Sequence, residues 1–149
     1  MKAILAIDQG TTGTTVAVMN TRGVLLGSVN YEFPQIYPKP GWVEHDPEAI
    51  WASVLKGIRA VFRKGLCKPA DVASIGITNQ RETSLLWERR SGKSLGNAIV
   101  WQCRRTASFC EGLRKKGLEP MVRDRTGLRK FLAARVYCCA PPHLCAAAP

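Results

Sequence analysis

A short polar turn near the N-terminus contains residue types that could hold a phosphate group. Residues 3–7 are apolar and predict a strand buried on both faces, and Asp8 ends that run. Residues 9–15 then contain Gly10, Gly13 and four threonines, including Thr11 and Thr12. Glycines let the backbone approach a ligand, hydroxyls can donate to phosphate oxygens, and an aspartate can hold Mg²⁺. The alternative is a polar β-turn that binds nothing.

The residues after this turn decide which kind of phosphate site it could be. P-loops and dinucleotide-binding turns continue into a helix, and neither of their glycine patterns occurs here. Residues 16–19 are apolar and partly β-branched, so they predict a second strand. A phosphate site would therefore lie in a strand–turn–strand hairpin.

The remaining elements predict an α/β fold around a mixed sheet. Residues 16–33 predict two further strands of a meander, and three prolines and a glycine within 34–42 predict a loop without regular structure. Asp46 and Pro47 predict the start of a helix that ends near Gly65. Strands are then expected at 71–78 and 84–88, a short extended segment at 97–101, and helices at 105–116 and 118–125.

A second polar turn, residues 79–83, follows the apolar strand expected at 71–78. Ligands of α/β sheets collect at strand ends, so the Asp8 turn and the Arg81–Glu82 turn could face one cleft. His45 precedes the helix start at Asp46 and receives no catalytic role, because a lone histidine there is more often a surface or local hydrogen-bonding residue.

Composition narrows the class of protein. At 149 residues with 46% hydrophobic content, the chain has room for one domain, and no apolar run approaches the roughly 18 residues of a membrane span. The N-terminus lacks a signal-peptide pattern, which favours a cytoplasmic protein with reduced thiols. Although the formal charge is +11, the basic residues are not interleaved with aromatic ones, and nucleic-acid binding is not expected.

Four separated segments resemble the FGGY family of carbohydrate kinases, in its glycerol-phosphorylating branch. They are Asp8 to Thr12, the loop from Gln35 to Pro47, Gly76 to Glu82, and Trp101 to Arg105. The resemblance spans residues 3–128 and implies an actin-like ATPase of two ribonuclease-H-like domains, with ATP and Mg²⁺ between them. It also implies a homo-oligomeric parent enzyme, of which residues 1–128 would form part of the N-terminal domain.

The resemblance also implies roles for individual residues. Gly10, Thr11, Thr12 and Gly13 would contact ATP, Asp8 would lie near the metal, and Thr11 would also lie near the substrate. Arg81 and Glu82 would bind glycerol hydroxyls, and Trp101 would cover the polyol carbons; these are the donor, acceptor and apolar face that a polyol needs. An exposed Arg81–Glu82 ion pair, worth about 0–1 kcal/mol, and core packing of Trp101 are the alternatives.

The sequence departs from the family in two places. Many members carry an arginine shortly after the threonine pair, whereas residues 13–15 here are Gly-Thr-Thr. Residues 129–149 are rich in Ala, Cys, Pro and Arg, which suggests a frameshift near Leu128. A divergent helix at 130–137 and a zinc site formed by Cys138, Cys139, His143 and Cys145 are the alternatives for this tail.

The functional expectation follows from the resemblance. An intact parent would transfer the γ-phosphoryl group of ATP to glycerol, giving glycerol 3-phosphate, and its general base, an aspartate, would lie in sequence absent here. These 149 residues alone are expected to show no kinase activity. The alternatives are another polyol or sugar kinase of the FGGY family, and a non-catalytic truncated fragment.

Overall fold

The computed structural model describes residues 2–127, and it divides the chain into two compact units. Among these residues, the first unit contains 2–35 and 45–80, and the second contains 36–44 and 81–127. The expectations for the tail, including its zinc alternative and its helix at 130–137, lie outside the described residues.

A four-stranded mixed sheet forms the first unit, with the strands in the order β3-β2-β1-β6. The first three strands make the predicted antiparallel meander, and β6 lies parallel to β1 on its other side. The predicted mixed sheet of an α/β fold is therefore confirmed. The strand bounds are β1 Ala3–Gln9, β2 Gly13–Asn20, β3 Leu25–Glu32 and β6 Val72–Asn79.

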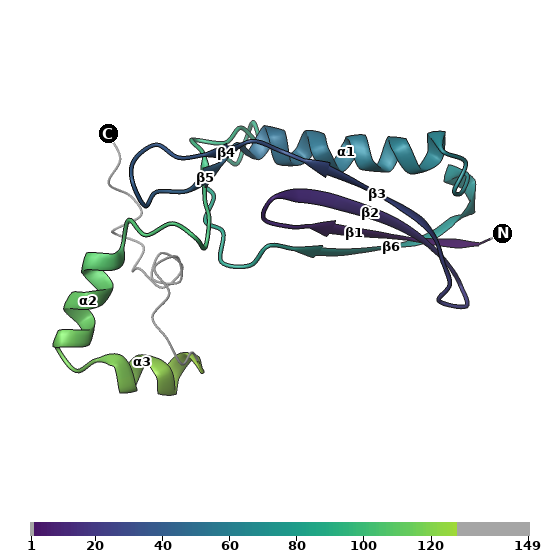
Figure 1. Ribbon diagram of the computed structural model, residues 1–149. Helices are drawn as coiled ribbons and strands as arrows, with labels where there is room; N and C mark the ends of the chain where they lie inside the picture. The colour runs from purple at the N-terminus through teal and green to yellow at the C-terminus, as the bar shows by residue number, and fades with distance from the viewer. Residues whose placement is uncertain (1, 128–149) are drawn as a thin grey trace. The chain divides into compact units, whose positions relative to one another are not determined.

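Helix α1 (Pro47–Arg63) runs along one face of this sheet (Figure 1). Its start was predicted correctly: the Asp46 carboxylate accepts a hydrogen bond from the Glu48 N–H at 2.9 Å, and Pro47 occupies the first turn, where its missing N–H costs nothing. After Lys64 the chain turns at Gly65, whose φ of +70° favours glycine. A short 3₁₀ helix, η1 (Pro69–Asp71), then leads into β6.

The core of the first unit lies between α1 and strands β1, β2 and β3. Alternate residues of each strand face the helix, as the period of two requires. Small residues of α1 let the helix approach closely: a Cβ on Gly57 would come within 2.5 Å of the Val16 Cγ2 atom. The buried cluster consists of Ala3, Leu5, Ile7, Val16, Val18, Val29, Ala60 and Val61.

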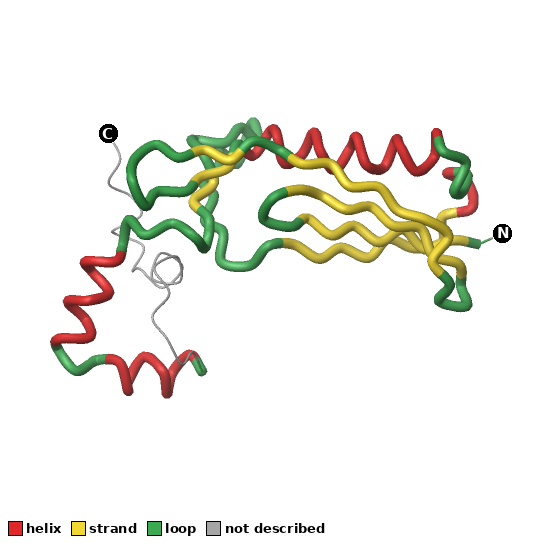
Figure 2. Tube along the Cα trace, viewed as in Figure 1, coloured by secondary structure: helices red, strands yellow, loops and turns green. Residues whose placement is uncertain are grey.

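Beyond this sheet and α1, the elements are short (Figure 2). A three-stranded sheet has the order β4-β5-β7, formed by Gln35–Ile36, Glu44–His45 and Ala98–Ile99. Helices α2 (Ala107–Lys115) and α3 (Glu119–Thr126) confirm the two helices predicted there. Among residues 2–127, none of the helices combines the length and apolar character that crossing a bilayer would need.

Two predictions of secondary structure were wrong. The strand expected at 84–88 is absent, and only isolated bridges pair Ser84 with Ile99 and Trp87 with Ser94. The loop at 34–42 contains the two-residue strand β4, because Pro34 and Pro38 flank residues that remain free to pair. The extended segment expected at 97–101 forms a strand only over β7.

Candidate functional site

The hairpin between β1 and β2 places the predicted phosphate-binding residues in one tight turn. The Gly10 N–H donates to the Gly13 carbonyl at 2.9 Å, and the Phe33 N–H donates to the Thr12 carbonyl at 3.3 Å. Asp8 and Thr12 are exposed, and Thr11 is half-buried. An exposed carboxylate and hydroxyl beside a glycine turn form a suitable donor and acceptor set for a phosphate and its cation.

Two of the four threonines face away from this turn. Thr14 is fully buried and shares a hydrogen bond of 2.7 Å with the Ser53 hydroxyl of α1. The Thr15 hydroxyl accepts from the Asn30 amide of β3 at 2.8 Å. Thr14 and Thr15 belong to β2, and their hydroxyls stabilise the strand through these hydrogen bonds. Of the four threonines, only Thr11 and Thr12 lie in the turn.

Gly13 is required by the packing of the neighbouring strand. A Cβ at this position would lie 2.8 Å from the Tyr31 carbonyl oxygen and 3.1 Å from the Glu32 Cα atom. Real Cβ atoms essentially never lie within 3.0 Å of an atom of a non-neighbouring residue, so the backbone of β3 would have to move. Gly10 is less confined, since its added Cβ would meet only the Gly13 carbonyl, at 3.2 Å.

The parallel strands β1 and β6 end at the same edge of the sheet. Gln9 pairs with Asn79, and the Gln80 N–H donates to the Gln9 carbonyl at 2.7 Å. The start of the second polar turn therefore lies beside the first turn, within the first unit.

The second polar turn has a strained backbone. Glu82 has a φ of +60° and is the one non-glycine residue with a positive φ in residues 2–127. Residues held in this region cost about 1–3 kcal/mol and cluster at functional sites. Beside it, Arg81 is exposed and the buried Thr83 hydroxyl has no hydrogen-bond partner among the described residues.

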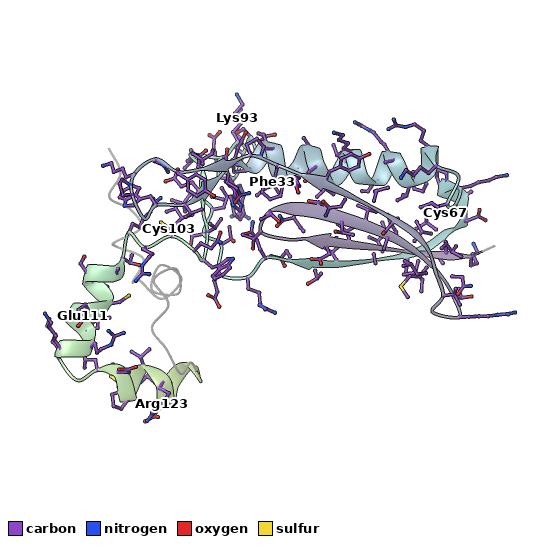
Figure 3. The ribbon with its side chains drawn as sticks, viewed as in Figure 1. Phe33, Cys67, Lys93, Cys103, Glu111 and Arg123 are labelled. Carbon is purple, nitrogen blue, oxygen red and sulfur yellow. The ribbon has the colours of Figure 1, made fainter. Side chains whose placement is uncertain are left out.

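Trp101 lies on a turn, and the residues that follow it contact other residues of the second unit. Its side chain is 42% exposed, so core packing does not account for it. The guanidinium of Arg105 lies 3.9 Å from the ring centre of Trp42 and forms an ion pair with Glu44. Cys103, labelled in Figure 3, accepts a hydrogen bond from the same arginine at 3.0 Å.

The Arg105–Glu44 pair remains charged despite its partial burial. Burial alone would raise the pKa of Glu44, but hydrogen bonds from Arg105 and Asn97 outweigh it and lower that pKa. The segment that carries Trp101 is thus attached to the loop at 39–44 by charge-assisted hydrogen bonds and by the Trp42 ring.

Sequence reasoning gave no role to His45, a buried residue whose partners lie next to both turns. Its side chain is fully buried, and its two ring nitrogens contact the side-chain amides of Gln35 at 2.6 Å and Gln80 at 3.1 Å. Phe33, labelled in Figure 3, packs edge-on against the imidazole. Burial lowers the pKa of His45, which keeps the ring neutral. The one indication in the sequence was that His45 lies in the loop from Gln35 to Pro47, which resembles the FGGY family.

The described residues contain no group of three or more His, Cys, Asp or Glu side chains that could hold a metal ion. A lone exposed Asp8 still fits Mg²⁺ bound to a nucleotide, because that ion takes one or two carboxylates and fills its other positions with phosphate oxygens and water.

The structure brings five predicted residues together in the β1–β2 hairpin: Asp8, Gly10, Thr11, Thr12 and Gly13. Arg81, Glu82 and Trp101 belong to the second unit. The single cleft expected for the two turns stays a prediction.

Comparisons with known proteins agree with these features. Residues 3–135 match the N-terminal domain of the FGGY family of carbohydrate kinases. Glycerol kinase of Caldanaerobacter subterraneus is 51% identical over 127 residues, and glycerol kinase 2 of Thermotoga maritima is 51% identical over 128; these spans are 85% and 86% of this chain. They are 26% of either relative, so the chain spans about a quarter of the length of the curated relatives it matches.

Solved structures share the fold. Plasmodium falciparum glycerol kinase with ADP aligns with a TM-score of 0.72 and 34% identity, over 83% of this chain and 25% of that one. Ligand-bound xylulose kinase from Lactobacillus acidophilus aligns with a TM-score of 0.73 and 26% identity, over 83% and 24%. With the family match over residues 3–135, these likenesses show that the chain belongs to the FGGY family of carbohydrate kinases and carries its N-terminal, actin-like fold.

Proposed function

We propose that this chain supplies the N-terminal part of the active site of an ATP-dependent glycerol kinase, a cytoplasmic and homo-oligomeric enzyme that forms glycerol 3-phosphate. The observation that carries the proposal is the pairing of β1 with β6. It sets Asn79 and Gln80, the two residues before Arg81, beside Gln9, and the Gln80 N–H donates to the Gln9 carbonyl at 2.7 Å. Support for glycerol comes from relatives named glycerol kinase that are 51% identical.

Each residue has a chemically reasonable task in this reaction. ATP supplies the phosphoryl group, and Gly10, Thr11, Thr12 and Gly13 would bind its phosphates through N–H and hydroxyl donors. Asp8 would hold Mg²⁺, directly or through water. Such a transfer depends mainly on positioning and on neutralising charge, which is what these groups provide.

The polyol would be bound by Arg81, Glu82 and Trp101. The guanidinium donates to hydroxyl oxygens, the carboxylate accepts from hydroxyl groups, and the indole covers the carbon atoms. The left-handed backbone at Glu82 supports this assignment, because strain of this kind persists where a side chain must be aimed.

A chimera tests the proposal. Residues 1–127 are joined to the part of Thermotoga maritima glycerol kinase 2 that lies beyond its match to this chain, and glycerol 3-phosphate formation is measured. We expect activity with glycerol, and little with 1,2-propanediol, which lacks one hydroxyl group. E82Q should raise KM for glycerol about 10- to 100-fold, the loss expected for one charged hydrogen bond.

The matched control is E88Q, in the exposed turn after Trp87, where Glu88 accepts a hydrogen bond from Ser91. Its kinetics should equal those of the parent chimera. A chimera that prefers xylulose or gluconate to glycerol would contradict the proposed substrate, and equal KM values for E82Q and E88Q would contradict the role of Glu82.

A further inference from the structure

A continuous set of hydrogen bonds joins the two polar turns through the interior of the first unit. The Gln35 side-chain amide donates to the carbonyls of Thr11, at 3.1 Å, and Phe33, at 3.3 Å. His45 Nε2 lies 2.6 Å from Gln35 Oε1, and His45 Nδ1 lies 3.1 Å from Gln80 Nε2. The groups therefore run from the Thr11 carbonyl to the residue that precedes Arg81.

The direction of these hydrogen bonds is fixed by counting donors. Both hydrogens of the Gln35 amide are used on carbonyl oxygens, so its Oε1 atom must accept from His45, and His45 Nε2 must carry the ring proton. Burial lowers the pKa of His45 and keeps its ring neutral, so Nδ1 has a lone pair that accepts from the Gln80 amide. One tautomer satisfies every contact.

We propose that His45 is a positioning residue that holds the Thr11 turn and Gln80, the residue before Arg81, in a fixed relation. The linked groups of Thr11, Gln35, His45 and Gln80 are called the His45 bridge. Its role in aligning nucleotide and polyol rests on the proposed function. Three features favour this role over simple packing. The His45 side chain is fully buried, and its partners Gln35 and Gln80 are 10 and 35 residues away in sequence. The bridge also ends at the Thr11 carbonyl, in the proposed phosphate turn.

The wild-type chain tests the tautomer directly. The sequence has two histidines, His45 and His143, so ¹⁵N-labelled histidine gives two sets of ring signals, and the spectrum of H45Q assigns them. At pH 7 the bridge requires a protonated Nε2 and an unprotonated Nδ1 in His45. A protonated Nδ1, or rapid averaging of the two tautomers, would overturn the proposal.

Two variants then separate the ends of the bridge. H45Q places an amide near the Nε2 position and keeps the donor to Gln35, whereas H45N keeps an acceptor near Nδ1 for Gln80 and loses that donor. The readout is hydrogen exchange of the Phe33 amide, which donates to the Thr12 carbonyl. We compare the exchange rate of the Phe33 amide with the rates of amides in the β1–β2 ladder. H45N should raise the Phe33 rate about tenfold relative to the ladder, and H45Q should leave it near the wild-type value.

A purely structural role predicts a different pattern. It would raise exchange at Phe33 and in the β1–β2 ladder by the same factor, and would make the two variants alike. Either result overturns the proposal. If neither variant folds, the wild-type tautomer still tests the hydrogen bonds of the bridge, and a protonated Nδ1 would overturn the proposal.

Glycerol tests the functional part. In the wild-type chain, glycerol should shift the amide signals of residues 10–13, and both H45N and H45Q should remove that shift, because each variant breaks the bridge at one end. Shifts that persist in either variant would overturn the coupling. If the wild-type chain shows no response to glycerol at up to molar concentration, the proposed glycerol site fails in this chain, while the tautomer and exchange results still judge the bridge itself.

Discussion

Strands β2 and β6 both pair with β1, one on each side, but they differ sharply in burial. Val16 and Val18 of β2 are fully buried, whereas Ile75 and Ile77 of β6 are 56% and 73% exposed. All four lie on the same face of the sheet, because they pair with Leu5 and Ile7. The difference arises from α1, which packs over β2 and β3 (Figure 1).

The comparison teaches that strand alternation and burial are separate properties. Apolar residues at every second position set which face of a strand is hydrophobic. The stabilisation comes only where another element covers that face, at roughly 25 cal/mol for each Å² of apolar surface removed from water. In this chain the covered strands supply the core, and β6 contributes chiefly through its backbone pairing with β1.

The largest expected effect tests this difference at two positions on the same face of the sheet. Leu5→Ala removes a side chain that is 1% exposed and should lower the free energy of unfolding by about 2–5 kcal/mol. Ile77→Thr keeps the β-branched shape on the exposed strand and should change it by about 0.5 kcal/mol or less. Urea unfolding followed by circular dichroism measures both, and equal losses would mean that β6 is covered in solution.

A second test concerns the helix that provides the cover. Gly57→Ala places a methyl group against Val16, only 2.5 Å from its Cγ2 atom, and should destabilise the chain by about 1–3 kcal/mol despite the better helix propensity of alanine. Gly112→Ala is the matched control within α2. Its added Cβ meets nothing within 4 Å, so it should be neutral or stabilising by up to about 1 kcal/mol. Stabilisation by both variants would show that α1 does not pack closely on β2.

The start of α1 provides a smaller effect. Asp46→Ala removes the acceptor for the Glu48 N–H and should cost about 1 kcal/mol in thermal or urea unfolding. Asp46→Asn retains a capping oxygen and should recover most of that loss. If the two substitutions cost the same, the charge of Asp46, rather than its hydrogen bond, stabilises the helix.

The smallest expected effect is a pH dependence of the free energy of unfolding. It arises from His45, whose ring contacts Gln80 just after the end of β6. Burial lowers the pKa of His45, so below the ordinary value near 6.5 the unfolded chain binds a proton that the folded ring does not. Stability should therefore fall as the pH decreases from about 6.5 towards the lowered pKa. H45Q cannot titrate there, and its stability should be flatter over that interval. Parallel curves for the two proteins would exclude this titration.

The predictable parts of the fold are those that local sequence controls. The apolar runs at 3–7 and 16–19, with Gly10 and Gly13 between them, predicted the β1–β2 hairpin, and Asp46 with Pro47 predicted the start of α1. The strand expected at 84–88 failed because its residues form only isolated bridges. An extended pattern predicts a strand only when a partner of matching length is available.

The site was less predictable because its geometry depends on distant contacts. The sequence marked Asp8, Thr11, Thr12, Arg81, Glu82 and Trp101 through a family resemblance, and their roles stay predictions. The His45 ring contacts the side chain of Gln80, 35 residues away, and periodicity carries no information about such a pair. The left-handed backbone of Glu82 was equally invisible, since glutamate has no preference for that conformation.

Gly13 has a consequence for experiments that select functional turns from random libraries. Its Cβ would lie 2.8 Å from the Tyr31 carbonyl, so glycine is demanded at this position by the neighbouring strand. A library randomised over residues 10–13 and selected only for folding should return glycine at 13 before any ligand is added. Enrichment that appears only when nucleotide is the selective pressure should then fall on Thr11 and Thr12, which separates recognition from architecture within a single turn.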